Sequence, residues 1–327
     1  MSNASLRPGG RRQIASAPVS CSVLTTFTPK KDIPQLNGKF ILVTGANAGL
    51  GKAAVAEFCR HQPSQVWLAA RSPDKARAAA DEIERLIPDA LIKLLNLDLS
   101  SFDSFNEAAK LVLQESSRLD ILMLNTGIMA TAPGLTRDCY KVQFSTNHLG
   151  HALLTKLLIS LLEKIARDRA AVCVVRVSSH GHHYAPTGGF LFDTLKTQAA
   201  RLTAFERCGQ SKLANILWER QLVKLYPQFT VAAVHPGVVK TNLLSGATDA
   251  PLLFRAVFGA AHVLGLKSSV ETGVKNQLWA SVSKDVVSGN YYEPVGAGRR
   301  ESAYGQDDKL AEEIWRWTEN ELREHAA

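Results

Sequence analysis

A glycine-rich turn near the start of the chain has the residue types that bind a dinucleotide. An apolar run, Phe40–Val43, leads into TGANAGLG at 44–51, and the helical pattern KAAVAEFCRH follows. In a strand–turn–helix of this kind the glycines let the backbone approach a pyrophosphate, and the free N–H groups of the first helical turn face the anion. A purely structural turn is the alternative, because many tight turns contain glycine. The motif predicts a nucleotide-phosphate site.

A second candidate for cofactor recognition follows the next apolar run. Residues 65–70, QVWLAA, predict a strand, and Arg71 comes directly after it. A carboxylate there would bind the ribose 2′-hydroxyl of NAD, whereas an Arg can hold the 2′-phosphate of NADP by charge-assisted hydrogen bonds. We therefore expect NADP(H), with Asn47 and Lys52 assisting beside the phosphate turn. The alternative for Arg71 is a solvated strand end.

The rest of the chain has the pattern needed to position such a site. Near-continuous apolar runs, typical of strands buried on both faces, alternate with helical patterns. The pattern predicts strands at 39–44, 65–70, 91–99, 119–127, 170–179 and 229–237, and helices near 50–61, 73–87, 102–117, 139–165 and 209–226. This alternation indicates an α/β fold with a doubly wound parallel sheet (a Rossmann fold) and a cofactor site at the carboxyl ends of the strands. We expect one domain over 36–327.

Composition and charge favour a globular protein without a nucleic-acid face. The 327 residues are 46% hydrophobic, and of the net charge of +8, +5 lies in residues 1–39. Residues 1–35 predict a flexible basic tail without a secretory signal, an organelle-targeting peptide being the alternative. No apolar run approaches the ~20 residues of a membrane helix. The five cysteines show no pairing pattern, so we expect reduced thiols and a cytoplasmic location.

Several further motifs, in order and at suitable spacing, resemble the short-chain dehydrogenase/reductase family between about residues 39 and 242. They are TGANAGLG, Asp98 with Leu99, NTG at 125–127, Asn147, VSS at 177–179, Ser211 with Lys212, and Pro236 with Gly237 followed by Val238 and Thr241. The segments NHLGHALLT, SKLANIL and HPGVVKTNL resemble the corresponding sequences of the branch that contains retinol dehydrogenases and the WW-domain oxidoreductase. NTG and GNYYEPVG are more similar to fungal members of that branch.

The resemblance implies a set of cofactor contacts. Asp98 should meet the adenine edge, Asn125 should line the nicotinamide side, and Lys212 should hold the nicotinamide ribose. The alternative for Asp98 is an N-cap of the helix that follows Ser100. The full set is Thr44, Gly45, Asn47, Gly49, Leu50, Gly51, Arg71, Asp98, Leu99, Asn125, Gly127, Lys212, Pro236, Gly237, Val238 and Thr241.

The catalytic pattern departs from the family at one position. In this family a Tyr four residues before a Lys transfers the proton, a Ser orients the substrate carbonyl and an Asn supports a water relay. Lys212, Ser179 and Asn147 match, but Cys208 stands where the Tyr is expected. A thiol is more acidic than a phenol, and beside Lys212 we expect its pKa to fall towards the thiolate, which cannot donate a proton.

Cys208 leaves three functions open. The first is an NADP(H)-dependent oxidoreductase of a hydrophobic carbonyl or alcohol in secondary-metabolite biosynthesis. Its proton would come from a water held by Ser179 and Lys212, or from Tyr184 or His182. The second is a scaffold diverted to a non-redox isomerisation, cyclisation or dehydration. The third is a non-catalytic dinucleotide-binding protein.

Two apolar segments suggest partners. Residues 243–266 should form a lid over a hydrophobic small-molecule substrate, with peripheral membrane contact as the alternative. The leucines of the predicted helix 139–165 fit either a homodimer contact or the core of the chain itself.

The histidines do not suggest a metal site. His180, His182 and His183 are not accompanied by Cys, Asp or Glu at ligand spacing, so we expect a loop at the mouth of the site and no bound metal. His148 and His151 should be packed structural residues of a helix.

Overall fold

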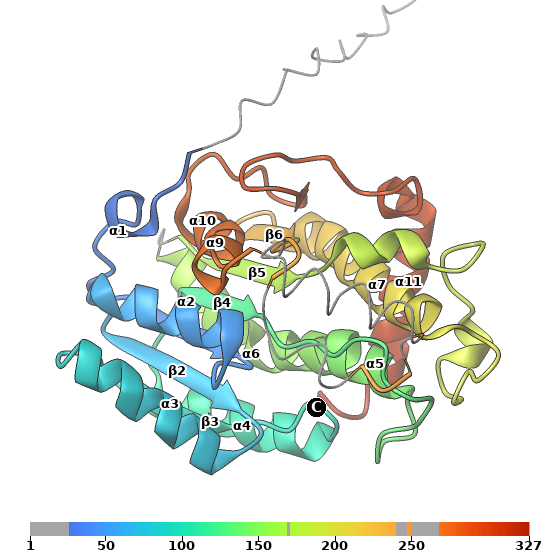
Figure 1. Ribbon diagram of the computed structural model, residues 1–327, viewed down its shortest axis with the longest axis horizontal. Helices are drawn as coiled ribbons and strands as arrows, with labels where there is room; N and C mark the ends of the chain where they lie inside the picture. The colour runs from blue at the N-terminus through green and yellow to red at the C-terminus, as the bar shows by residue number, and fades with distance from the viewer. Residues whose placement is uncertain (1–25, 169–170, 240–246, 250, 252–267, 327) are drawn as a thin grey trace, which may run out of the picture.

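The computed structural model contains a seven-stranded parallel sheet in the order β3-β2-β1-β4-β5-β6-β7 (Figure 1). It describes residues 26–168, 171–239, 247–249, 251 and 268–326. The strands are β1 (Phe40–Thr44), β2 (Gln65–Ala70), β3 (Ile92–Asn96), β4 (Ile121–Leu124), β5 (Cys173–Val177), β6 (Thr230–Val234) and β7 (Tyr291–Tyr292). This confirms the predicted Rossmann-type sheet, and the order reverses between β1 and β4, where such folds bind ligands.

Helices cover both faces of the sheet (Figure 1). The α-helices are α1 (Pro29–Asp32), α2 (Gly49–Arg60), α3 (Pro73–Leu86), α4 (Phe102–Glu115), α5 (Val142–Phe144), α6 (Gly150–Arg167), α7 (Ala204–Leu225), α9 (Val270–Gly273), α10 (Lys275–Val282) and α11 (Asp308–Glu321). One core cluster joins the sheet to α2, α3 and α10, and the other joins it to α4, α6, α7 and α11. Alternate residues of each strand enter opposite clusters, as with Leu42 and Val43 of β1.

The predicted strands and helices are found within a few residues of their expected bounds, with three differences. The pattern at 139–165 contains a π-helix, Ser145–Leu149, between α5 and α6. Helix α7 begins five residues before the predicted start, because Thr203 and Glu206 form a capping box. The short strand β7 was not predicted, since two residues carry no measurable periodicity.

Part of the predicted tail packs against the domain. Residues 26–35 include α1, and Phe27 and Ile33 are buried in the cluster with α2 and α10. Residues 1–25 lie outside the described residues. In the described part of the chain, no helix is long and apolar enough to cross a membrane.

The leucines of α6 are used inside the chain itself. Leu153, Leu154 and Leu158 are fully buried in the core cluster. Helix α11 lies along α7, where Trp315 stacks on Trp218 with ring centroids 4.9 Å apart. Core packing therefore accounts for the leucine pattern, and the homodimer stays a prediction.

A buried carboxylate at the amino edge of the sheet provides the first testable prediction. Asp120 accepts hydrogen bonds from Arg118, from Lys39 and from the backbone N–H of Phe40. Burial alone would raise the pKa of Asp120, but these donors together lower it. We expect Asp120→Asn to reduce the free energy of unfolding by about 2 kcal/mol at pH 7.

The pH dependence follows from the direction of that shift. A lowered pKa stabilises the fold above the unfolded value, and this stabilisation is lost as the pH falls through the folded value. Urea unfolding of Asp120→Asn should therefore differ from the parent from pH 7 down to about pH 4, and converge with it only at lower pH, where Asp120 becomes protonated in the folded protein. The exposed Asp89→Asn is the control, and equal unfolding midpoints for Asp120→Asn and the parent at pH 7 would contradict the role of Asp120.

Candidate active site

One cavity, of about 310 Å³, lies where the strand order reverses. Its walls come from the turn after β1, the loop after β4, the end of β5, helix α7 and the segment after β6. Most of the predicted site residues with described positions meet here. They are Gly45, Gly49, Leu50, Asn125, Gly127, Ser179, Cys208, Lys212, Pro236 and Gly237.

The glycine turn allows the end of β1, the loop after β4 and the start of α2 to approach closely. Gly45 has φ of +65°, and a Cβ on it would lie 2.6 Å from Thr126 Oγ1. A Cβ on Gly51, in the first turn of α2, would lie 2.4 Å from the carbonyl oxygen of Gly45. A side chain at either position would therefore clash with atoms of the turn or of the loop after β4. The first N–H groups of α2 have no partner within the helix, as at any helix N-terminus, and can face an anion.

Asn125 and Thr44 connect β1 and β4, the two strands between which the strand order reverses (the switch point of the sheet). The hydroxyl of Thr44 accepts hydrogen bonds from the backbone N–H groups of Asn125 and Thr126 and pairs with His151 Nε2 at 2.9 Å. The Asn125 amide donates to the Thr44 carbonyl at 2.9 Å. These contacts hold the end of β1 against the loop after β4, which both line the cavity. His151 and His148 are both fully buried and hydrogen-bonded, which confirms their predicted structural role.

Lys212 reaches the cavity from α7. Its Nζ donates to the Val177 carbonyl at 3.0 Å, and a Cβ on Gly127 would lie only 3.1 Å from it. Burial, with a smaller contribution from the charge of Arg176, lowers the pKa of Lys212 to about 8. The amine therefore changes charge close to neutral pH.

Cys208 lies one helical turn before Lys212 and is 6% exposed. Burial raises the pKa of its thiol, and this outweighs the opposing charge of Lys212. The expectation of a thiolate is therefore wrong: the side chain keeps its proton at neutral pH. Its Sγ lies 3.9 Å from the Ile128 carbonyl.

Ser179 lies two residues after the end of β5 and is the N-cap of a short 3₁₀ helix, His180–Tyr184. Its Oγ accepts a hydrogen bond from the Gly181 N–H at 3.0 Å, so its own hydrogen is available for a substrate oxygen.

The two alternative donors proposed from that loop do not reach the cavity. Both ring nitrogens of the buried His182 are engaged, Nδ1 with the Ser179 carbonyl at 2.7 Å and Nε2 with the Ser302 N–H at 2.9 Å. Burial also lowers the pKa of His182 to about 4. Tyr184 is 56% exposed and lines a separate hollow with Phe205. His182 is therefore a structural residue, and Tyr184 is absent from the cavity lining.

Asn147 lies in the π-helix between α5 and α6. Its amide accepts from the Ile128 N–H at 2.8 Å and donates to the Ile128 carbonyl at 3.0 Å and to Ser211 Oγ at 2.8 Å. The extra residue of a π-turn turns this side chain towards the loop after β4. Asn147 thereby ties that loop to the helix that carries Cys208 and Lys212.

The remaining predicted cofactor residues are not among those that line this cavity. Arg71 is exposed directly after β2, and Asn47 lies in the glycine turn. Asp98 accepts from the backbone N–H and the hydroxyl of Ser100, while the N-cap of α4 is Ser101. Leu99 is buried in the core and Val238 is 50% exposed. Thr241 and most of the predicted lid 243–266 lie outside the described residues.

Other lining residues were not singled out from the sequence. The apolar Ile128 and Met129 follow the NTG motif, and His235 precedes Pro236. His235 Nδ1 is buried without a hydrogen-bond partner among the described residues, and burial lowers the pKa of this ring to about 4. The HPG motif gave a signal for His235, whereas Ile128 and Met129 were indistinguishable from core residues.

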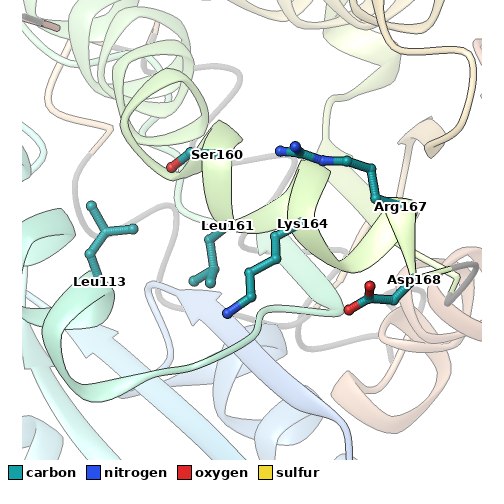
Figure 2. Close-up of a pocket in the computed structure, with 6 residues that line it drawn as sticks. All are labelled: Leu113, Ser160, Leu161, Lys164, Arg167 and Asp168. Carbon is teal, nitrogen blue, oxygen red and sulfur yellow. The ribbon is translucent and has the colours of Figure 1, made fainter.

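A second hollow lies between α4 and α6, near the amino ends of the strands (Figure 2). Figure 2 shows Leu113 near the end of α4 facing residues of α6, among them Lys164 and Arg167. The carboxyl ends of these helices lead to the amino ends of β4 and β5, away from the glycine turn. This hollow is therefore not the nucleotide site.

The comparisons with known proteins agree with this geometry. The family model for short chain dehydrogenase matches residues 39–251, so the chain belongs to the short-chain dehydrogenase family of oxidoreductases. It is 36% identical over 307 residues to short-chain dehydrogenase/reductase drtF of Aspergillus calidoustus, which covers 89% of this chain and 96% of that protein. It is 34% identical to human retinol dehydrogenase 14, over 86% of this chain and 85% of the relative.

A solved structure shows the same fold. The crystal structure of an uncharacterized protein from Mycobacterium paratuberculosis superimposes with a TM-score of 0.71 at 28% identity, covering 91% of this chain and 98% of that one. The relatives confirm the predicted family and its resemblance to retinol dehydrogenases.

Proposed function

We propose that the protein is an NADP(H)-dependent oxidoreductase that interconverts a hydrophobic carbonyl compound and its alcohol. One observation carries this proposal. The glycine turn, Asn125, Ser179, Cys208 and Lys212 line the same cavity at the switch point of the sheet.

The residues present fit a nicotinamide dinucleotide. The glycine turn would hold the pyrophosphate, Asn125 would face the nicotinamide, and Lys212 would hold its ribose. Arg71 would bind the 2′-phosphate, and its exposed position directly after β2 supports this proposal. When bound, the reduced nicotinamide supplies a hydride to the substrate carbonyl carbon.

The side chains of the cavity then handle the substrate oxygen. The Ser179 hydroxyl orients the carbonyl by donating a hydrogen bond. Cys208 Sγ–H gives its proton to the developing alkoxide, and the sulfur is left as a thiolate. The ammonium group of Lys212 stabilises that thiolate, which takes a proton back from water. Burial raises the pKa of the Cys208 thiol, so its acidity approaches that of the tyrosine phenol that the family uses at this position.

The lining points to an apolar substrate. Leu50, Ile128, Met129 and Pro236 contribute mainly carbon surface, and Cys208 occupies less space than a Tyr would. We infer the secondary-metabolite role from this apolar lining and from the similarity to fungal short-chain dehydrogenases such as drtF. The cytoplasmic location and peripheral membrane contact stay predictions.

Cofactor choice gives a direct test of this function. Arg71→Ala removes a guanidinium that would make charge-assisted hydrogen bonds, each worth about 1.5–3 kcal/mol. We expect the dissociation constant of NADPH to rise about 10- to 100-fold, while that of NADH stays unchanged. Fluorescence titration of both dinucleotides measures this, and equal weak binding of the two to the parent protein would contradict the proposal.

The pH dependence of turnover should follow Lys212. Its pKa of about 8 means that the amine loses its charge just above neutral pH. Turnover should therefore be flat from about pH 6 to 7.5 and fall above about pH 8, since the thiolate of Cys208 then lacks its counter-charge. His182 and His235 stay neutral over this range. A rate that rises steadily to pH 10 would contradict this role.

A further inference from the structure

A buried ion pair lies beneath the candidate site, and the proposed function does not use it. Arg176 in β5 and Glu219 in α7 are 0% and 1% exposed, with Arg176 Nε 2.5 Å from Glu219 Oε1. The guanidinium also lies over the Trp218 ring, 4.6 Å from its centroid. Arg176 Nη2 and Glu219 Oε2 are buried without hydrogen-bond partners among the described residues. Since an apolar pair of similar volume is often as stable as such a pair, packing alone does not explain it.

A chain of polar contacts leads from this pair to the lysine of the cavity. Arg176 Nη1 lies 3.4 Å from Asn215 Oδ1, and Asn215 Nδ2 donates to the Val177 carbonyl at 3.4 Å. The same carbonyl accepts the hydrogen bond from Lys212 Nζ at 3.0 Å. Lys212, Asn215 and Glu219 are spaced i, i+3 and i+7 on α7, so they share one face of the helix.

We propose that Arg176 and Glu219 are positioning residues that hold Asn215 and the Val177 carbonyl in place and thereby aim Lys212 into the cavity. This inference rests on the proposed function only for the role of Lys212. It gives the buried pair a task that an apolar pair could not perform, because an apolar pair offers Asn215 no polar partner.

The charge of Arg176 acts on Lys212 as well. It adds to the effect of burial in lowering the pKa of Lys212. The other titratable groups that face Lys212 are Cys208 on the same helix, His151 of α6 and His235 after β6. Burial keeps both histidines neutral and Cys208 protonated at pH 7. Arg176 is thus the permanent charge that acts on Lys212 among the described residues.

The groups around the pair itself are also uncharged at pH 7. His148 lies 3.4 Å from Arg176 Nη1, and burial lowers the pKa of its ring. Cys173, three residues before Arg176 in β5, has a pKa raised to about 12 by burial. Within the pair, burial raises the pKa of Glu219, and the Arg176 guanidinium opposes this shift. Removing both partners together therefore avoids leaving one buried charge alone.

The test compares the Arg176→Met/Glu219→Leu double variant with the parent and with Arg220→Met. Arg220 is also on α7, but it pairs with Asp308 at the surface and with Glu301, and not with a residue of the chain of contacts to Lys212. A small acylating reagent labels Lys212 in the protein without added dinucleotide, and mass spectrometry gives the labelling rate from pH 6 to 11. In the double variant the charge of Arg176 is gone, so we expect the pH midpoint of Lys212 labelling to rise and labelling at pH 8 to be about fivefold slower. We also expect NADPH to bind about tenfold more weakly, because Lys212 is no longer held in place. Arg220→Met should match the parent.

An unchanged labelling profile and unchanged NADPH affinity in a folded double variant would overturn the proposal. Should that variant fail to fold, Arg176→Lys replaces it, since this change keeps the charge but shortens the reach to Asn215. We then expect weaker NADPH binding at an unchanged labelling midpoint, and unchanged binding would again overturn the proposal. A parent protein that does not bind NADPH defeats the proposed function alone, because the labelling comparison still decides the role of the pair.

Discussion

Replacing Lys212 by Met should abolish measurable turnover, with a fall of about 10³-fold or more. The change removes the donor to the Val177 carbonyl, the proposed contact to the nicotinamide ribose and the proposed counter-charge for the Cys208 thiolate at once. The fold should survive, because the Val177 carbonyl still accepts a hydrogen bond from Asn215. Reduction of a panel of hydrophobic aldehydes and ketones, followed by NADPH absorbance, measures the effect.

The matched control for this prediction is Lys224→Met. Lys224 lies on the same helix, but it is paired with Asp308 at the surface. Turnover by Lys224→Met should equal that of the parent. If Lys212→Met retained the parent rate, the cavity around Lys212 would not be the working site.

Replacing Cys208 by Ala should lower the rate of carbonyl reduction about 10²- to 10⁴-fold, which is the usual contribution of a general acid. Ala keeps the buried helix position but has no proton to give. NADPH binding should change little, because the glycine turn and Lys212 are untouched. Stopped-flow measurement of the first turnover separates this loss from slower product release.

The Cys208→Tyr variant is the companion experiment. It supplies the phenol that the family uses in this place, so reduction of small aldehydes should match or exceed that of the parent. Bulky ketones should be reduced more slowly, since the larger ring occupies part of the 310 Å³ cavity. Parent-like reduction by Cys208→Ala would show that the thiol is not the proton donor.

The sequence was sufficient for the architecture and for most of the cavity. The order of apolar runs predicted the parallel sheet, and the glycine turn and the NTG and SK motifs predicted residues that meet at its switch point. These features are local in sequence: a strand, a turn and a helix start specify where each backbone segment must go.

The properties that depend on burial could not be predicted in this way. The predicted low pKa of Cys208 was wrong, because the sequence shows the charge of Lys212 four residues away but not the burial of the thiol. The loss of water around the thiol, which raises its pKa, is a property of the folded chain. His182 was a plausible donor until both of its ring nitrogens proved to be engaged. Arg176 stood within an apolar strand run, but its partner Glu219 is 43 residues away and only the packing of α7 on β5 joins them.

The most direct test of the account follows a labelled hydride. The parent protein and Lys212→Met are each incubated with NADPH deuterated at both C4 positions and with the panel of hydrophobic carbonyl compounds, and the products are analysed by mass spectrometry. The account predicts deuterium on the carbinol carbon of an alcohol formed by the parent, and none above background with Lys212→Met. A parent protein that binds NADPH but transfers no deuterium to any carbonyl compound would contradict it.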